Sequence, residues 1–310
     1  MFNIAQNSLY AMILTIAVLV ISTLIYQYKK VKNPNKDFKE LGLRIKSWWW
    51  MIGIVFLALS ISLKSALIFF AFLSFLALKE FLSIVSVRYV DRRAIFWAYL
   101  SIPLQYYWIS IGWYGMFIIF IPVYLFLFIP IRLVLIGETN GFIKSASIIQ
   151  WATMLTVFSI SHIAYLMALP VHNSLAGNIG PVLFLLIMTQ FNDVSQYVFG
   201  KLFGKHKIIP KVSPNKTWEG FLGGVFSVTL ISGIVAPYLT PLDISYGFMA
   251  GFIISCIGFF GDVVISSVKR DIGIKDTGTF IPGHGGILDR IDSLMYTAPV
   301  FFHFLYYVSY

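Results

Sequence analysis

Residues 262–292 read DVVISSVKRDIGIKDTGTFIPGHGGILDRID, and long hydrophobic segments flank this polar stretch on both sides. The stretch holds five of the chain's thirteen acidic residues and four of its twenty-three lysines and arginines. Glycines recur within it from Gly273 to Gly286. Charge and glycine concentrated between two hydrophobic segments predict polar chemistry at a membrane surface.

The composition of the whole chain explains why a membrane is expected. Of the 310 residues, 58% are hydrophobic and 12% are charged, whereas a soluble domain has about 25% charged residues. Aromatic residues reach 17%, which fits aromatic belts at the lipid–water interface. The single cysteine, Cys256, excludes an intrachain disulfide and a cysteine metal site. We therefore predict an all-α integral membrane protein.

Ten hydrophobic segments are expected to cross the membrane as helices, because about twenty apolar residues span its hydrocarbon core. These segments are residues 8–26, 48–63, 66–78, 94–111, 114–131, 148–169, 182–199, 221–239, 246–266 and 294–310. We expect two regions: residues 1–145 with about five spans, and residues 146–310 as the catalytic region.

The distribution of positive charge predicts the orientation. If the N-terminus is non-cytoplasmic, the cytoplasmic connections are residues 28–46, 79–93, 132–147, 200–219 and 267–292. They hold 22 of the 23 lysines and arginines, with Lys64 the exception, as the positive-inside rule requires. Both termini are then non-cytoplasmic, and loops 200–219 and 267–292 face the cytoplasm. The net charge of +10 is explained in the same way, so no nucleic-acid partner is expected.

Two polar clusters precede the opening stretch. Asn192 and Asp193 lie near the end of the seventh segment, where a carboxylate marks a functional site by default; a polar contact between helices is the alternative interpretation. In residues 200–224, Lys216 and Thr217 stand at the head of the next helix. They predict an anion site, because a helix N-terminus offers free N–H groups. The lysines before Pro210 are also explained by contact with anionic lipid.

The third cluster is the opening stretch itself. Asp262 comes from one segment, while Asp289 and Asp292 share one face of the next helix. Carboxylates from two segments suit Mg²⁺, which prefers hard oxygen ligands and substrate phosphates. Glycines within 283–286 would let backbone N–H groups approach phosphate oxygens. The cations expected to balance phosphate charge are Lys269, Arg270 and Arg290.

Residues 266–292, SSVKRDIGIKDTGTFIPGHGGILDRID, resemble the signature of the phosphatidate cytidylyltransferases, also called CDP-diacylglycerol synthases. Residues 213–220, SPNKTWEG, resemble a second conserved block of that family, with Asn215 where lysine is common. Residues 192–200, NDVSQYVFG, are similar to a third block and depart from it at 195–197. The resemblance covers about residues 190–300, and residues 77–81 (ALKEF) match the family in character.

The resemblance implies transfer of CMP from CTP to phosphatidic acid, giving CDP-diacylglycerol and pyrophosphate. It implies metal ligation by Asp262 and Asp289, with Mg²⁺ and possible room for a second metal ion. The implied catalytic residues are Asp262, Lys269, Asp289 and Arg290. The implied substrate-binding residues are Asp193, Ser213, Lys216, Thr217, Glu219, Arg270, His284, Gly285 and Gly286. The implied partners are CTP, phosphatidic acid, membrane lipids and a second copy in a homodimer.

Three other functions fit the sequence less well. A CTP-dependent polyprenol or lipid kinase would share the membrane architecture, but the intact PGHGGILDRID block argues against it. A CDP-alcohol phosphotransferase would need a D-G-x-x-A-R block, which the sequence lacks. A multi-pass transporter, with Asp193 and Asp262 coupling ions, would place its site near the midplane, whereas the charges here gather at one face. In a bacterium, the expected location is the inner membrane, with the active site facing the cytoplasm.

Overall fold

The computed structural model describes residues 4–35 and 37–310, and within these ranges the chain forms helices and no β-strand. Residues 1–3, in the expected N-terminal region, and Lys36, one of the basic residues of 28–46, lie outside the described residues. The elements are α1 (Gln6–Lys32), α2 (Lys39–Ile61), α3 (Leu63–Ile84), η1 (Tyr89–Asp91), α4 (Arg92–Ser110), α5 (Tyr114–Ile119), η2 (Phe120–Leu125), α6 (Phe126–Val134), α7 (Phe142–Thr153), η3 (Met154–Phe158), α8 (Ser159–Leu166), α9 (Ile179–Phe203), α10 (Trp218–Leu239), α11 (Ile244–Asp271) and α12 (Leu288–Ser309). The π-helical turns η2 and η3 join α5 to α6 and α7 to α8.

Eight helices in the described residues are long and hydrophobic enough to cross a membrane. They are α1, α2, α3, the joined helices Tyr114–Val134 and Phe142–Leu166, α9, α10 and α11. The chain is therefore an all-helical integral membrane protein. The two other expected spans are also helical, as α4 and α12, but they do not meet that standard. Helix α12 carries Asp289, Arg290 and Asp292 in its first turns.

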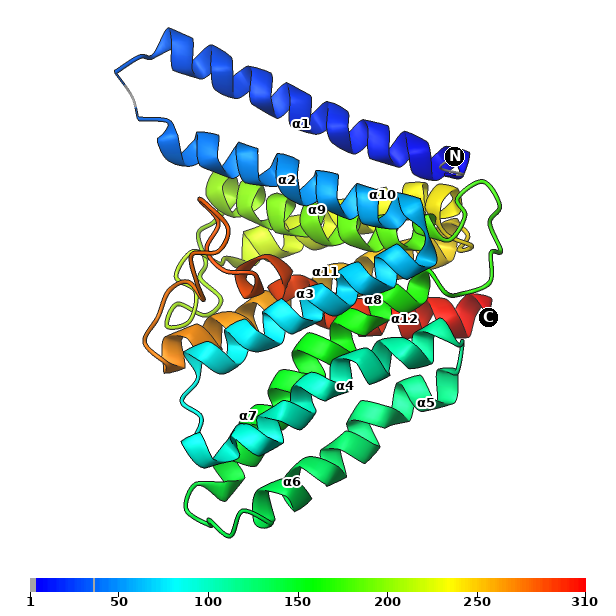
Figure 1. Ribbon diagram of the computed structural model, residues 1–310. Coiled ribbons are helices and arrows are strands. Elements are labelled where there is room, and N and C mark those ends of the chain that lie inside the picture. The colour runs from blue at the N-terminus through cyan, green and yellow to red at the C-terminus, as the bar shows by residue number, and fades with distance from the viewer. Residues whose placement is uncertain (1–3, 36) are drawn as a thin grey trace.

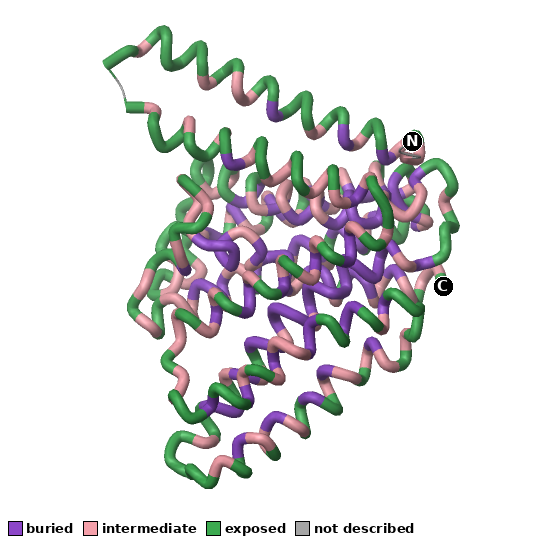
Figure 2. Tube along the Cα trace, viewed as in Figure 1, coloured by how far each residue is buried: buried purple, intermediate pink, exposed green. Residues whose placement is uncertain are grey.

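The surface of the bundle is hydrophobic where lipid would contact it. On α1, for example, Leu14 is 67% exposed, and Ile21 and Leu24 are exposed as well. Figure 2 shows the buried residues concentrated in the middle of the bundle, while α1 is exposed along most of its length. A soluble monomer rarely exposes so large an apolar surface, so these faces suit the hydrocarbon core.

The helices run between two ends of the bundle. Figure 1 shows both marked chain ends at one end, together with the connections from α8 to α9 and from α10 to α11. The opposite end carries the α9–α10 and α11–α12 connections, residues 204–217 and 272–287. We call it the loop end. These two polar connections are thus neighbours in space.

Several helices extend beyond the hydrophobic segments that predict them. Helix α3 continues to Ile84, and α11 continues to Asp271. Residues 79–84 and 267–271, which lie in the expected connections 79–93 and 267–292, are therefore helical. Hydropathy marks the membrane interior, whereas helical hydrogen bonding continues at headgroup level, where lysine and arginine are tolerated. Lys269 and Arg270 consequently project from a helix.

The split between α2 and α3 depends on Ser62. Its backbone is extended, and its hydroxyl accepts a hydrogen bond from the Ser65 N–H at 3.1 Å. The Ser65 hydroxyl in turn accepts a hydrogen bond from the Ser62 N–H at 2.9 Å. This reciprocal cap satisfies two backbone donors that a new helix would leave unpaired, so one helix ends and the next begins within two residues.

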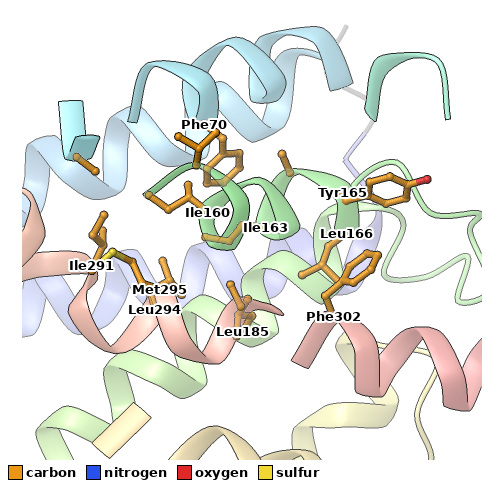
Figure 3. Packing of buried hydrophobic residues seen from close by; sticks show 14 of the residues in the cluster. Phe70, Ile160, Ile163, Tyr165, Leu166, Leu185, Ile291, Leu294, Met295 and Phe302 are labelled. Carbon is orange, nitrogen blue, oxygen red and sulfur yellow. The ribbon is translucent and has the colours of Figure 1, made fainter. Parts of the chain in front are cut away.

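A hydrophobic core holds α12 in the middle of the bundle. Figure 3 shows side chains of α8 packed between those of α3 and α12. The residues labelled there are Phe70 of α3, Ile160, Ile163, Tyr165 and Leu166 of α8, Leu185 of α9, and Ile291, Leu294, Met295 and Phe302 of α12. Such close packing resists displacement. It fixes α12 against helices from both halves of the chain.

Candidate functional site

Two lysine–carboxylate ion pairs lie at the loop end. The Lys216 Nζ is 2.6 Å from the Asp262 Oδ2, which joins the start of α10 to α11. The same ammonium lies 3.4 Å from the Gln196 Oε1 and 5.0 Å from the centre of the Phe259 ring. Both partners of the pair are partly exposed, with 18% and 26% of their side chains accessible. A ligand at this end can therefore reach the pair.

The second ion pair is more deeply buried. The Lys269 Nζ is 2.8 Å from the Asp289 Oδ1, and the two side chains are 11% and 4% exposed. The Asp289 Oδ2 accepts hydrogen bonds from the Thr277 N–H at 2.8 Å, the Thr277 hydroxyl at 3.0 Å and the Gly286 N–H at 2.9 Å. Asp289 thus binds both α11 and the signature loop, residues 272–287.

Asp193 lies near the Lys216–Asp262 ion pair, whereas Asn192 is bonded elsewhere between helices. The Asp193 Oδ1 accepts a hydrogen bond from the Ser293 hydroxyl of α12 at 3.1 Å, and its carboxylate interacts electrostatically with Lys216 and Asp262. Asn192 is fully buried, and its Oδ1 accepts a hydrogen bond from the Ser255 hydroxyl at 2.6 Å. The alternative interpretation, a polar contact between helices, therefore describes Asn192.

The two arginines differ in their partners. Arg270 is exposed and donates hydrogen bonds to the carbonyls of Val212 and Ile274, both at 3.2 Å. It connects the α9–α10 loop to the signature loop. Arg290 is half-buried, and its Nε makes no hydrogen bond within the described part of the chain. Since no ion pair is formed by Arg290 there either, its guanidinium has capacity for an anionic ligand.

Three predicted substrate-binding residues at the α9–α10 connection, Ser213, Thr217 and Glu219, form hydrogen bonds with groups in or next to the same connection. The Thr217 hydroxyl caps α10 by accepting from the Gly220 N–H at 3.2 Å. The Glu219 carboxylate lies 2.6 Å from the His206 Nδ1 and accepts from the Lys205 N–H at 3.0 Å. Ser213 takes part in a backbone turn, in which its carbonyl accepts from the Lys216 N–H at 3.3 Å. Substrate contact by Ser213, Thr217 and Glu219 stays a prediction.

The turn from Pro282 to Gly286 is held by α2. The Ser47 hydroxyl donates to the Pro282 carbonyl at 2.7 Å, and the Arg44 Nε donates to the Gly283 carbonyl at 3.1 Å. The His284 ring packs edge-on against Trp48, with ring centres 5.9 Å apart. Helix α2 therefore forms one wall of the signature loop.

The surroundings of His284 disfavour its charged form. Partial burial lowers the pKa of its imidazole below the ordinary 6.5, and the guanidinium groups of Arg290 and Arg44 lower it further. A substrate role for His284 stays a prediction.

Two glycines allow the carboxylates to approach the loop. Gly285 has a φ of +87°, and a Cβ at this position would lie 2.7 Å from the Asp289 Oδ2. A Cβ at Gly286 would overlap the carboxylate of Glu80 and the hydroxyl of Thr277. Their observed role is to make space, since the Gly286 N–H donates to Asp289 rather than remaining free for a phosphate oxygen. Direct substrate contact by either glycine stays a prediction.

Glu80 is the residue of this region that sequence reasoning missed. It lies near the end of α3, far from the signature in sequence, and accepts from the N–H groups of Ile287 at 2.9 Å and Leu288 at 3.0 Å. The Thr277 hydroxyl, which can donate its one hydrogen to either Asp289 or Glu80, lies within hydrogen-bonding distance of the same carboxylate. The available signal was an acidic residue at the end of a hydrophobic segment, within the family-like residues 77–81.

The donor chemistry of the cluster suits a divalent cation, but its arrangement does not present a metal site. Asp193, Asp262 and Asp292 are hard oxygen donors within electrostatic range of one another. However, the described residues include no group of three or more histidine, cysteine, aspartate or glutamate side chains that could hold a metal ion. Asp289 already accepts from Lys269 and the loop. Metal ligation by Asp262 and Asp289 therefore stays a prediction.

For Asp292 and Asp276 in residues 262–292, two roles are chemically open, contact with a metal ion or support of the neighbouring cations Arg290 and Lys275. The Asp292 Oδ1 accepts from the Ser293 N–H at 2.8 Å. Asp276 is exposed on the signature loop. Within the described residues, neither forms an ion pair with Arg290 or Lys275. The supporting role is thus not seen in this arrangement.

Comparisons with known proteins agree with the signature. The model of the Cytidylyltransferase family matches residues 42–308. Uncharacterized protein YnbB of Escherichia coli (strain K12) is 44% identical over 294 residues, which cover 95% of this chain and 97% of that protein.

Two relatives carry the name phosphatidate cytidylyltransferase. That of Staphylococcus aureus (strain COL) is 43% identical over 121 residues, 38% of this chain and 46% of that protein. That of Mycobacterium leprae (strain TN) is 42% identical over 121 residues, 39% of each chain. The match to these two enzymes spans less than half of their length, so it supports their activity here only as a proposal.

Proposed function

Because the chain belongs to the cytidylyltransferase family, we propose that it transfers CMP from CTP to phosphatidic acid, giving CDP-diacylglycerol and pyrophosphate. The observation that carries this proposal is a cluster of charged side chains at one end of a membrane bundle. Three cations, Lys216, Lys269 and Arg290, lie there with four carboxylates, those of Asp193, Asp262, Asp289 and Asp292. The relatives named phosphatidate cytidylyltransferase support the choice of substrate.

The proposed reaction needs charge stabilisation more than acid–base chemistry. A phosphate oxygen of phosphatidic acid attacks the α-phosphorus of CTP, and the bond from that phosphorus to the oxygen bridging to the β-phosphate breaks. The attacking oxygen is already anionic at neutral pH, so no strong general base is required. The chain's task is to position two anionic phosphates and balance their charge, for which Lys216, Lys269 and Arg290 are suited.

We include Mg²⁺ in the proposal, with a second metal ion as an option. Bound to the nucleotide phosphates, Mg²⁺ would neutralise charge on the departing pyrophosphate. Of the two predicted ligands, Asp262 is the better suited, because 26% of its side chain is exposed. Asp289 is the less available, because backbone and lysine donors already occupy it.

The proposed orientation follows from the charge distribution. We propose that ten helices cross the membrane, with α4 and α12 included, and that both termini are non-cytoplasmic. The loop end then faces the cytoplasm, and in a bacterium the location is the inner membrane. Phosphatidic acid would enter sideways from the inner leaflet at headgroup level, and the working form would be a homodimer.

The test is a product assay on the purified protein in detergent. With phosphatidic acid, CTP and Mg²⁺, we expect release of pyrophosphate and formation of CDP-diacylglycerol, measured together. Diacylglycerol in place of phosphatidic acid is the control, because it lacks the attacking phosphate. If no phosphatidic acid species supports pyrophosphate release, the proposal is wrong. Release of CDP with a polyprenol acceptor would indicate a lipid kinase instead.

A further inference from the structure

Glu80 makes the contacts of a helix cap although it lies outside the helix it caps. Its Oε2 accepts from the Ile287 N–H and its Oε1 from the Leu288 N–H, at the first residues of α12. The first N–H groups of a helix have no partner within the helix. A carboxylate placed there also interacts favourably with the helix dipole. Glu80 is therefore well matched to the start of α12.

The same carboxylate is linked to Asp289 through one side chain. The Thr277 hydroxyl lies between them, within hydrogen-bonding distance of both Glu80 and Asp289. The Thr277 N–H then donates to Asp289. A change at Glu80 would thus be transmitted to Asp289 by two routes, through Thr277 and through the first turn of α12.

Packing of α3 against α12 explains why Glu80, in the first half of the chain, reaches the start of α12, in the second half. Helix α3 touches α8 and α12, and Phe70 of α3 is buried against the same core as Met295 of α12. This core fixes the distance between the end of α3 and the start of α12. Because no residue smaller than glutamate would bridge the same distance with two acceptor oxygens, the position calls for this side chain.

We propose that Glu80 is a positioning residue: by holding the first turn of α12, it keeps Asp289 and Arg290 in place for the reaction. The inference rests on the proposed function as far as the reaction is concerned. That Glu80 holds the first turn of α12 does not depend on which reaction the protein catalyses. It also means that residues 1–145 complete the site rather than only anchoring it.

The test compares Glu80→Gln with the wild type and with Glu138→Gln, a matched change at an exposed glutamate of the α6–α7 connection. Glutamine keeps the shape but has one acceptor oxygen, so one of the two N–H groups loses its partner. We expect kcat for pyrophosphate release to fall on the order of 10- to 100-fold, as for other residues that orient a site. The KM for CTP should change less. Glu138→Gln should behave like the wild type.

Hydrogen–deuterium exchange supplies a readout that does not need activity. In Glu80→Gln, the peptide covering residues 277–290 should take up deuterium faster than in the wild type, while peptides of α9 stay unchanged. Unchanged uptake in that peptide overturns the proposal, and so does faster uptake with wild-type kcat. If the wild type itself releases no pyrophosphate, the proposed function fails, whereas the exchange data still decide whether Glu80 holds the helix.

A second variant covers the case in which Glu80→Gln does not fold. Thr277→Val keeps the shape of the side chain but removes the hydroxyl between Glu80 and Asp289. We expect a folded protein, by gel filtration, with faster exchange in 277–290 and a lower kcat. Wild-type exchange and kcat in this variant would overturn the link from Glu80 to Asp289.

Discussion

Asp262 of α11 forms an ion pair with Lys216, which lies just before α10. Among the described residues, no other ion pair connects these two parts of the chain. The other Asp262 oxygen accepts from the Ser266 hydroxyl one turn later, at 3.2 Å. A lysine at a membrane surface that loses its carboxylate becomes free to rotate away, since an ammonium on a flexible stem keeps no fixed geometry alone. The effect of this residue is therefore on the placement of Lys216.

Asp262→Asn should lower pyrophosphate release on the order of 100-fold or more, a size typical of losing one charged group that is arranged for the transition state. The measurement is initial rate at saturating CTP, together with the melting temperature. Asp243→Asn is the matched control, because Asp243 caps the opposite end of α11 and asparagine caps equally well. Wild-type rates in Asp262→Asn would contradict any role of this carboxylate.

At the scale of elements, the signature loop and the start of α12 are held by side chains from three other segments. Glu80 comes from α3, Arg44 and Ser47 come from α2, and Lys269 comes from α11. The loop itself contributes few apolar side chains that could fold it independently. Its conformation is stabilised where Arg44 and Ser47 donate to its carbonyls and Glu80 accepts from the Ile287 N–H.

Gly286→Ala should destabilise the protein by about 1–3 kcal/mol, the usual cost of overpacking. The new methyl group would overlap the carboxylate of Glu80 and the hydroxyl of Thr277. Pyrophosphate release should fall with it, since the first turn of α12 must shift. Thermal unfolding in detergent measures the change.

The control is Gly53→Ala in α2, where no atom lies within 4 Å of the added Cβ. Alanine favours a helix interior over glycine by roughly 0.5–1 kcal/mol, so this variant should match or exceed the wild-type melting temperature. Equal stability of Gly286→Ala and Gly53→Ala would show that the loop has room for a side chain.

The helices could be predicted from the sequence more completely than the site. Lipid leaves few choices for a backbone, so each hydrophobic segment predicted a helix. The polar clusters could be assigned to one end because the positive-inside rule predicts that the lysine- and arginine-rich connections lie on one side. The partners of Lys216 and Lys269 could not be predicted, because each cation had several acidic residues within possible reach. Glu80 was missed because its contact joins segments on opposite sides of the chain's midpoint.

For the whole molecule, the proposed orientation concerns the face of the membrane at which the loop end lies. The charge distribution predicts the cytoplasmic face, which can be tested on cells with Cys256→Ala as background. Ser174→Cys is in the α8–α9 connection and Lys211→Cys in the α9–α10 connection, and both positions are exposed. A membrane-impermeant maleimide should label Ser174→Cys in intact cells and Lys211→Cys only after permeabilisation. The reverse pattern would invert the proposed orientation.

Helix contacts connect residues 1–145 with residues 146–310. Helix α3 of the first region packs against α8 and α12 of the second, and α1 contacts α9 and α10. Composition alone suggested that the chemistry lies in the second region, because the clustered charges are there. The first region supplies single side chains, Arg44, Ser47 and Glu80, whose importance depends on where the fold brings them.

When a lysine already pairs with a carboxylate, an incoming anion must replace that pair. The anion then gains only the difference in interaction free energy between the new ion pair and the old one. Occupied lysines at 216 and 269 therefore temper the affinity for any phosphate compound, compared with the same lysines left unpaired. The carboxylate also competes for its lysine as a product departs, which favours release. Ion pairs that neutralise these two lysines in the resting protein would in this way set a limit on how long a highly charged product stays bound.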